Sequence, residues 1–332
     1  MDHQSFSLKP MTVGGILDTT FQIYRNNFIT ILAFSALISG IFDVLQLTAT
    51  LLMAPTGALS DPWGILITAI KSGNPETFLS AMPTPVIGTD YLLRTILMSG
   101  VAGFLGIVGS LCIIPFVQGG IIHITQQYLH GKSLDVKTAF QDTISRFGKL
   151  VLTALSVMVY YIAVSFAAMV IIIVFVIPLV FLGIAMGNGS NVLAIVGFIM
   201  LLIVFIFVMI ALFLIAYTFI SFVYPVAITE GLFHFNAIGR SFKLVSKKFW
   251  KVLGVNLLAY LLVYLVIGAI SAVAFTFVMI VPAASIFQQI LTLLVTALVL
   301  PITYIVITVL YYDVRIRSEG YDIEVMTQRI EG

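Results

Sequence analysis

Two long stretches of the chain contain no Asp, Glu, Lys, Arg or His. One runs from Leu150 to Thr229 over 80 residues, and the other runs from Val252 to Tyr312 over 61 residues. A helix that crosses a bilayer needs about 20 apolar residues, so each stretch can hold two crossings and a turn. Charged residues make up 9% of the chain and hydrophobic residues 61%, whereas soluble domains carry about 25% charged residues. We therefore predict an all-α, multi-pass membrane protein.

The apolar segments predict six transmembrane helices. They cover approximately residues 28–53, 92–115 and beyond, 150–176, 192–224, 252–281 and 290–311. The loop from about 54 to 91 is the longest on its side of the membrane. It contains Asp61-Pro62 and Asn74-Pro75, and each pairs an N-cap residue with a proline suited to the first helical position. We expect two short helices in this loop.

A pattern of an amphipathic helix, a basic step and an apolar span ending in proline occurs three times. Apolar residues lie at offsets 0, 3, 4, 8 and 11 from Val13 and from Val136, and at offsets 0, 4 and 11 from Ile238. Such self-similarity is the signature of an internal repeat. We predict a single membrane domain over 1–332, with repeats at about 8–130, 131–232 and 233–318, and a charged cytoplasmic tail at 319–332.

The basic residues predict the orientation. With a cytoplasmic N-terminus, 14 of the 16 Lys and Arg residues fall on the inside, and Lys71 and Arg94 fall on the outside. The positive-inside rule then places both termini in the cytoplasm. We expect the protein to lie in the cell membrane. The N-terminus has no basic region leading into a short apolar core, so we expect no cleavable signal peptide.

The three amphipathic helices all fall on the predicted cytoplasmic side, and each is followed by cations. Such helices lie in the membrane interface with their cations near anionic headgroups. They could merely anchor the following span, or they could form a basic collar that binds anionic lipid or a protein partner. The candidate lipid contacts are Arg25, Arg146, Lys149, Lys247, Lys248 and Lys251.

Polar residues inside predicted spans are the first candidates for a functional site. Asp43 and Gln46 share a helix face, and Arg94 begins the second span on the same side. An Asp43–Arg94 ion pair is one interpretation, and a proton or ion relay is the other. Further candidates are Gln118 and His123, in a polar segment that also contains His130 and could line a wet inner vestibule.

Three further features each have two interpretations. Glycines 100, 103, 106 and 109 recur every third residue, which favours close helix packing over a channel lining. Prolines 55, 115, 178, 225, 282 and 301, at repeat-related places, could be static kinks or hinges. The mixed-sign cluster from Asp313 to Glu324 could be a solvated tail, or it could dock onto the basic collar.

Catalytic signatures are missing from the sequence. It has no HExxH, GxSxG, Walker or GxGxxG motif, and a single cysteine, Cys112, rules out a disulfide framework. The two histidines 123 and 130 have no acid beside them in the sequence and make a poor metal site. We expect no enzyme activity, no cofactor, no metal and no nucleic-acid partner.

Two terminal segments resemble a known family. They run from Lys9 to Phe21 with Arg25 to Phe28, and from Tyr311 to Asp322. They are similar to the opening and closing segments of the bacterial integral-membrane family named for the membrane domain of glycerophosphoryl diester phosphodiesterase. In the named enzyme, the resemblance implies a membrane module fused to a soluble catalytic barrel. This chain has no room for the barrel, so the resemblance implies a stand-alone membrane module.

Together these features predict a non-enzymatic membrane module that organises or senses lipid or a partner protein at the cytoplasmic membrane. The expected partners are membrane lipids, anionic ones above all, with a protein partner at the cytoplasmic face left open. The alternative is a transporter or exporter of a lipid or an amphipathic peptide, favoured by the repeats, the prolines and the glycine-rich span.

Overall fold

The computed structural model describes residues 9–53, 71, 89–131, 136–187, 192–280 and 285–321. Within these ranges every regular element is a helix, which confirms the all-α class. The helices are α1 (Val13–Asn26), α2 (Phe28–Met53), α5 (Thr89–Val108), η1 (Gly109–Ile113), α6 (Ile114–Leu129), α7 (Val136–Ser145), α8 (Phe147–Gly187), α9 (Val192–Ile220), α10 (Val223–Thr229), α11 (His234–Lys247), α12 (Phe249–Ile280) and α13 (Ser285–Glu319).

Five helical segments are long and apolar enough to cross a membrane. They are Ser99–Leu129, Phe147–Ile184, Ile195–Thr229, Phe249–Phe277 and Leu293–Glu319. The chain is therefore a multi-pass membrane protein. The first of the six predicted spans coincides with α2, but the apolar part described there, Phe28–Gly40, is shorter. The two short helices expected between residues 54 and 91 lie outside the described residues.

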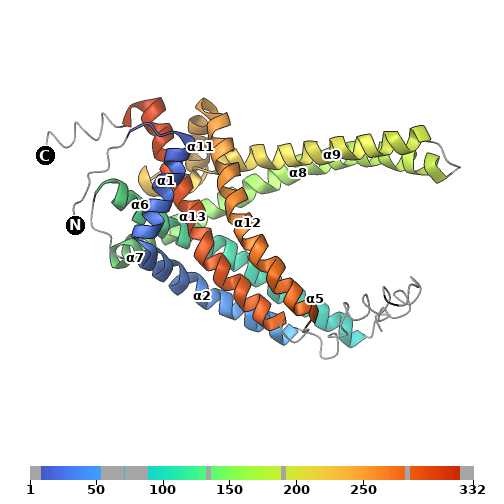
Figure 1. The fold of residues 1–332 in the computed structure, drawn as a ribbon, viewed down its shortest axis with the longest axis horizontal. Helices are drawn as coiled ribbons and strands as arrows, with labels where there is room; N and C mark the ends of the chain where they lie inside the picture. Colours follow the sequence, from blue (N-terminus) through green and yellow to red (C-terminus); the bar gives the residue numbers. More distant parts are fainter. Residues whose placement is uncertain are drawn as a thin grey trace.

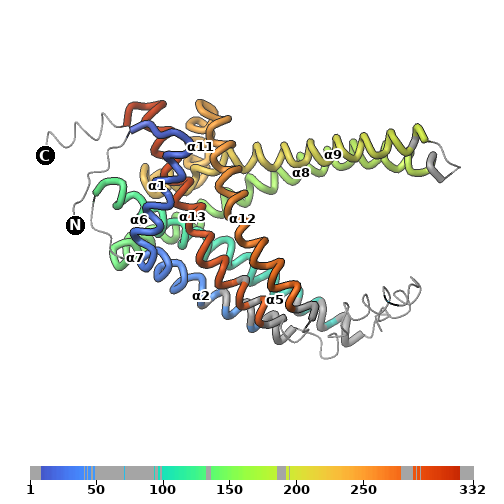
Figure 2. The backbone as a smooth tube through the Cα atoms, viewed as in Figure 1, coloured from blue at the N-terminus to red at the C-terminus, as the bar shows by residue number. Residues whose placement is uncertain are grey.

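The helices form a head and two diverging arms (Figure 1). In the head, the short helices α1, α6, α7, α10 and α11 pack around the ends of the long helices. The first arm is the α8–α9 hairpin, and the second arm contains α2, α5, α12 and α13. In the second arm α13 contacts both α2 and α12, and Figure 2 shows it between α1 and α12 near the head.

The protein core lies in the head. Its largest fully buried side chains include Tyr311, Tyr312, Phe34 and Phe222. By contrast, none of the most apolar stretch of α9 is buried within the protein, whereas 56% of the corresponding stretch of α13 is. Burial of apolar side chains against each other stabilises the head, and the exposed apolar surface of the first arm is suited to lipid.

The three amphipathic helices pack onto protein more than we predicted. Ile16 and Ile23 of α1, Ala139 of α7, and Leu244 of α11 are all completely buried. The buried part of each apolar stripe packs against another helix, α13 for α1, α6 for α7 and α8 for α11. Each helix still exposes large apolar residues, which are Val13 and Phe21 on α1, Ile144 on α7 and Phe235 on α11.

Each amphipathic helix meets its long helix at a single joint residue. The joints are Asn27, Arg146 and Lys248. At Asn27 the side-chain amide donates a hydrogen bond of 2.9 Å to the carbonyl of Ile23, which caps the end of α1. A one-residue joint fixes the angle between the two helices, and so fixes where the following long helix leaves the head.

Helix α2 approaches α6 closely at a glycine. A Cβ built on Gly120 would lie 1.9 Å from Cζ of Phe34, whose ring is buried in the core. Among the four regularly spaced glycines, only the last is approached in this way, since a Cβ on Gly109 would lie 2.6 Å from the Phe42 ring. No described atom lies within 4 Å of the Cβ positions of Gly100, Gly103 and Gly106, so for these three the close packing stays a prediction.

Candidate functional site

A cavity of about 390 Å³ lies where the bases of the two arms meet, and we call it the vertex cavity. Its wall takes residues from η1, α6, α8, α9, α10, α12 and α13, so it depends on the assembled head. Most of the lining is aliphatic. The polar groups on it come mainly from Gln118 and five tyrosines, which are Tyr161, Tyr217, Tyr224, Tyr260 and Tyr304.

The tyrosines at the vertex join the two arms. The hydroxyls of Tyr217 on α9 and Tyr260 on α12 lie 2.5 Å apart, and the two rings meet edge to face. Beside them, the hydroxyl of Tyr160 on α8 donates to the carbonyl of Ala216 on α9 at 2.9 Å. Tyrosine suits this position because its ring packs with apolar groups while its hydroxyl can bind a polar one.

Gln118 brings an unsatisfied acceptor into the vertex cavity. Its Oε1 atom is buried and has no hydrogen-bond donor among the described residues. A buried acceptor without a donor costs about 1–3 kcal/mol. A bound molecule that carried a hydroxyl or N–H group could satisfy this atom, while its apolar part contacted the aliphatic wall.

The helix at the edge of the cavity has a π turn. The segment η1, Gly109–Ile113, connects α5 to α6 directly before Pro115, and the N–H of Ile114 donates to the carbonyl of Gly109. Proline has no N–H and its ring clashes with the carbonyl four residues earlier, and a wider turn relieves both problems. Ser110, Leu111 and Pro225 all line the cavity, so two of the six predicted kink or hinge prolines, Pro115 and Pro225, lie at or beside it. Pro55 and Pro282 lie outside the described residues.

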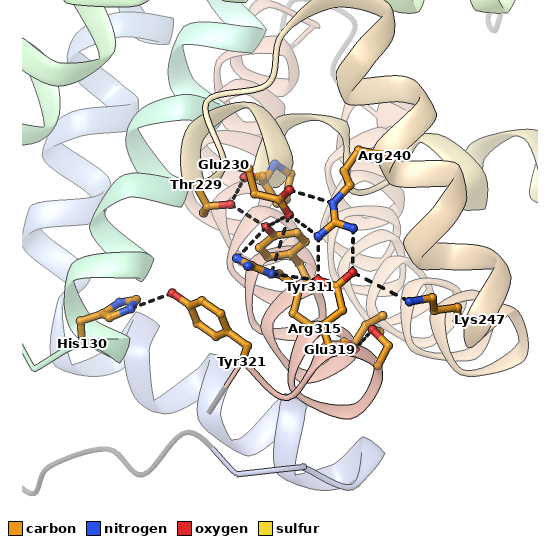
Figure 3. A network of polar contacts seen from close by, with 12 residues as sticks. His130, Thr229, Glu230, Arg240, Lys247, Tyr311, Arg315, Glu319 and Tyr321 are labelled. Carbon is orange, nitrogen blue, oxygen red and sulfur yellow. Dashed lines mark hydrogen bonds and ion pairs between the residues drawn. The ribbon is translucent and has the colours of Figure 1, made fainter. Parts of the chain in front are cut away.

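A charged network on the head connects three helices (Figure 3). Arg240 of α11 donates to Glu230 at 2.7 Å and to Glu319 of α13 at 2.6 Å. The Tyr311 hydroxyl donates to Glu230 at 2.7 Å and accepts from Thr229 at 2.7 Å. Hydrogen bonds with Glu319 and then Glu230 raise the pKa of Arg240 above its ordinary value, so the guanidinium stays charged.

Asp313 forms a second charged cluster with the start of α1. Its carboxylate is completely buried. It accepts hydrogen bonds from the N–H of Met11 at 2.7 Å, from Lys251 at 2.5 Å and from Arg317 at 3.1 Å. Lys251 and Arg317 each also donate to the carbonyl of Met11 at 2.8 Å. Of the two interpretations of the mixed-sign cluster, docking onto basic residues is correct for Asp313 and Glu319, and a solvated tail is wrong for them. Both carboxylates belong to the long helix α13 and contact basic residues of other helices.

A polar recess of about 690 Å³ lies on the head side of the vertex cavity. It includes His123, Arg146 and Lys149. The Nδ1 atom of His123 lies 3.2 Å from Asp142, and its Nε2 atom lies 3.0 Å from the amide of Gln127. Sequence spacing missed this acid, because Asp142 belongs to α7, while His123 belongs to α6. No group of three His, Cys, Asp or Glu residues suited to a metal occurs in the described part of the chain.

The predicted site residues fall in different places. Gln118 lines the vertex cavity and His123 lines the recess, while the side chains of Asp43, Gln46 and Arg94 lie outside the described part of the structure, so their ion pair stays a prediction. Among the predicted lipid contacts, Arg25 and Lys248 are exposed, and Lys251 binds the buried Asp313.

The remaining predicted lipid contacts lie close to protein groups. Lys247 lies 3.9 Å from Glu319. Arg146 pairs with Asp142 at 3.0 Å and donates to the carbonyl of Ile228 at 2.9 Å. The ammonium of Lys149 lies over the ring of Phe233, 5.3 Å from its centre. Contact of these cations with lipid stays a prediction.

The vertex tyrosines were missed in the sequence. Tyr217 and Tyr224 are seven residues apart in one uncharged stretch, and Tyr260 and Tyr264 are four apart in the other. Both spacings put the pair on one helix face. Clusters of hydroxyl-bearing aromatics inside spans were therefore the available signal. A second, purely apolar groove between α12 and α13, lined by Ala269, Val273 and Phe287 among others, offers no polar group.

The chain matches no protein-family model, no curated protein and no solved structure. Its resemblance to the glycerophosphoryl diester phosphodiesterase membrane-domain family therefore stays a prediction that rests on the two terminal segments.

Proposed function

We propose that the protein is a non-enzymatic membrane module that holds a lipid at the junction of its two arms. The single observation that carries this proposal is the vertex cavity, which places tyrosine hydroxyls and an unsatisfied glutamine oxygen inside an otherwise aliphatic wall. A lipid has the same two-part chemistry, with polar groups at the glycerol or sphingoid linkage and apolar chains beyond it.

The surroundings of the cavity support this choice. Helices α8 and α9 present large apolar side chains outward, such as Phe166, Phe181 and Phe207. In a bilayer these surfaces contact acyl chains, so the cavity opens among lipids rather than in water. Cavities that bind small molecules are mostly apolar with a few placed polar groups, which is the composition found here.

A non-enzymatic role agrees with how the carboxylates are used. Glu230 is engaged by Arg240 and Tyr311, and Asp313 by Lys251 and Arg317. Both carboxylates join helices to one another, and neither lines the vertex cavity. General acid–base chemistry needs a group within hydrogen-bond reach of the reacting molecule.

We also propose six spans in three repeats, with the head at the cytoplasmic side. The joints support the repeat, because the residues four positions after them, Ile31, Leu150 and Val252, are all completely buried. In the first repeat the joint residue lies 14 residues after Val13, whereas in the other two repeats it lies 10 residues after Val136 or Ile238. When the three joints are aligned, the first repeat is therefore shifted by one helical turn relative to the alignment from the sequence offsets. The basic residues of the head favour the cytoplasmic side.

The second candidate function is transport of a lipid or an amphipathic peptide. The observation that favours it is the π turn and Pro115 next to the cavity, together with Pro225 in its wall. Such interruptions lie at the binding sites of several transporters, where helices bend. In this case the two arms would move relative to one another around the vertex.

Two measurements separate these functions. The purified protein should retain lipid through detergent exchange, in a ratio near one per chain. Replacing Gln118 and Tyr217 together by Leu and Phe should reduce that ratio, whereas Tyr264→Phe on the surface of α12 should not. Facilitated movement of a labelled lipid or peptide across proteoliposome membranes would favour the transporter, and lipid retention without such movement would favour the module. Absence of retained lipid in the wild-type protein would contradict the lipid-holding module.

A further inference from the structure

The vertex cavity and the polar recess are stacked along the same three helices. On α6 the cavity is lined by Gln118 and Ile122, and the recess begins at His123. On α8 the order is reversed along the chain, with Lys149 in the recess and Ala154 in the cavity. The two helices run antiparallel here, so the recess lies at the head end and the cavity lies deeper among the apolar arms.

On helix α10, as on α6, the residues that line the cavity come before those that line the recess. A small apolar cluster separates the cavity from the recess. Tyr224 and Pro225 line the cavity, while Ile228 and Thr229 line the recess. The separating cluster consists of Ile122, Leu150, Ala227 and Ile228, with Tyr224 and Phe233 packed against it. An apolar space below a polar recess matches the way in which a lipid presents its chains and its headgroup.

Among the described residues, one cation of the recess is not neutralised by a protein carboxylate. Lys149 is exposed, and no carboxylate lies within ion-pair distance of it in the described part of the chain. Arg146 lies three residues earlier, so both cations share one face of the helix start. Asp142 and the carbonyl of Ile228 take two of the bonds that Arg146 can make, and a guanidinium has five N–H donors.

The acidic group of the recess is already occupied. Glu230 lines the recess but accepts from Arg240 and Tyr311. Asp142, which lies next to the recess, faces Arg146 and His123. The opposite side supplies Gln126, Gln127 and His130, and the buried Oε1 atom of Gln127 has no donor in the described structure. The recess therefore combines cations for an anion with an acceptor for a neighbouring hydroxyl or ammonium group.

We propose that the recess binds the headgroup phosphate of an anionic membrane lipid, with Lys149 and Arg146 as the phosphate contacts. Arg binds phosphate through several N–H donors, and Lys adds a flexible point charge. The apolar chains of the lipid then lie along α8, towards the vertex cavity. This inference rests on the proposed lipid-holding function and adds the headgroup chemistry and its position.

The test uses the full chain reconstituted in vesicles of phosphatidylcholine and phosphatidylglycerol, then extracted in mild detergent. The ratio of the two lipids retained by the protein is measured by mass spectrometry. Lys149→Gln should lower the preference for phosphatidylglycerol about fivefold, since one cation near the surface contributes about 1 kcal/mol. Lys243→Gln, an exposed cation of the head that is not among the predicted lipid contacts, is the matched control and should leave the preference unchanged.

The outcomes separate the sources of phosphate and the two proposals. Loss of preference in both variants would indicate a diffuse basic surface and overturn the recess. An unchanged preference in Lys149→Gln and in the charge-reversed Lys149→Glu would overturn it as well. Inorganic phosphate is the second probe. If it binds the wild type in a Lys149-dependent way while the lipid preference does not depend on Lys149, the recess takes a soluble phosphate and the lipid proposal fails. In each of these cases total retained lipid stays the same, whereas failure of the lipid-holding function removes it.

Discussion

Tyr217 on α9 and Tyr260 on α12 join the two arms of the molecule through hydroxyls that lie 2.5 Å apart. The pair forms part of the wall of the vertex cavity, so one contact links the shape of the cavity to the angle between the arms. The arms diverge from this point (Figure 1), and the first arm has little other contact with the second. Changes at the pair should therefore alter stability and lipid binding together.

Replacing Tyr217 by Phe should lower the free energy of unfolding by about 1 kcal/mol, because it removes one hydrogen bond and leaves the Tyr260 hydroxyl without its partner. Tyr264→Phe is the matched control, since Tyr264 is 62% exposed and stacks on Tyr260 without sharing this bond. Denaturation in one detergent, followed by circular dichroism, measures both. Equal stability of the two variants would show that the hydroxyl pair contributes nothing to joining the arms.

The contact between α2 and α6 predicts opposite effects for two glycine substitutions. Gly120→Ala should destabilise the protein by about 1–3 kcal/mol, because the new methyl group meets the ring of Phe34, which is only 1% exposed. Gly106→Ala should stabilise it by about 0.5–1 kcal/mol, because no described atom lies near and alanine favours a helix. Thermal melts compare the two variants, and a destabilised Gly106→Ala would reveal packing at that helix face.

The buried carboxylate of Asp313 should be essential for a stable head. Asp313→Asn leaves Lys251 and Arg317 without their charge partner, and removing one member of a buried ion pair costs about 3–5 kcal/mol. Asp313→Asn combined with Lys251→Gln should recover part of this loss, because the double variant leaves no Lys251 ammonium without its carboxylate partner. Melting temperatures of the single and double variants decide the point. Strictly additive losses would mean that the two residues are not energetically coupled.

The proposed orientation predicts opposite labelling at the head and at the far end of the first arm. In a Cys112→Ser background, a cysteine at Ser246 should react with a membrane-impermeant maleimide only after the cells are permeabilised. A cysteine at Leu193, which is 83% exposed near the turn of the α8–α9 hairpin, should react in intact cells. Labelling of Ser246→Cys in intact cells would reverse the orientation.

Much of the helical framework could be predicted from the sequence, because it follows from local composition. The uncharged stretches located α8, α9, α12 and α13, and the apolar spacing located α1, α7 and α11. The predicted edges differ from the observed ones at several helices. For example, α8 begins at Phe147 and continues to Gly187, because Pro178 is tolerated inside it.

The contacts between helices could not be predicted in the same way. No local pattern predicts that Met11 lies beside Asp313 or His123 beside Asp142, because the members of each pair belong to separate segments of the chain. The same holds for the vertex cavity, whose wall takes residues from seven helical segments. The sequence pattern correctly predicted which residues form the apolar face of a helix. Whether that face contacts lipid or protein depends on tertiary packing.

Photo-crosslinking of a lipid tests the central proposal most directly. The protein is reconstituted with a phospholipid that carries a photoreactive group in its acyl chain near the glycerol, and the crosslinked residues are mapped by mass spectrometry. We predict crosslinks concentrated at the vertex cavity, on residues such as Met158, Tyr161 and Ile220, and reduced in the Gln118→Leu, Tyr217→Phe double variant. Crosslinks spread evenly over the exposed faces of α8 and α9, and unchanged in that variant, would contradict a specific lipid site at the junction of the arms.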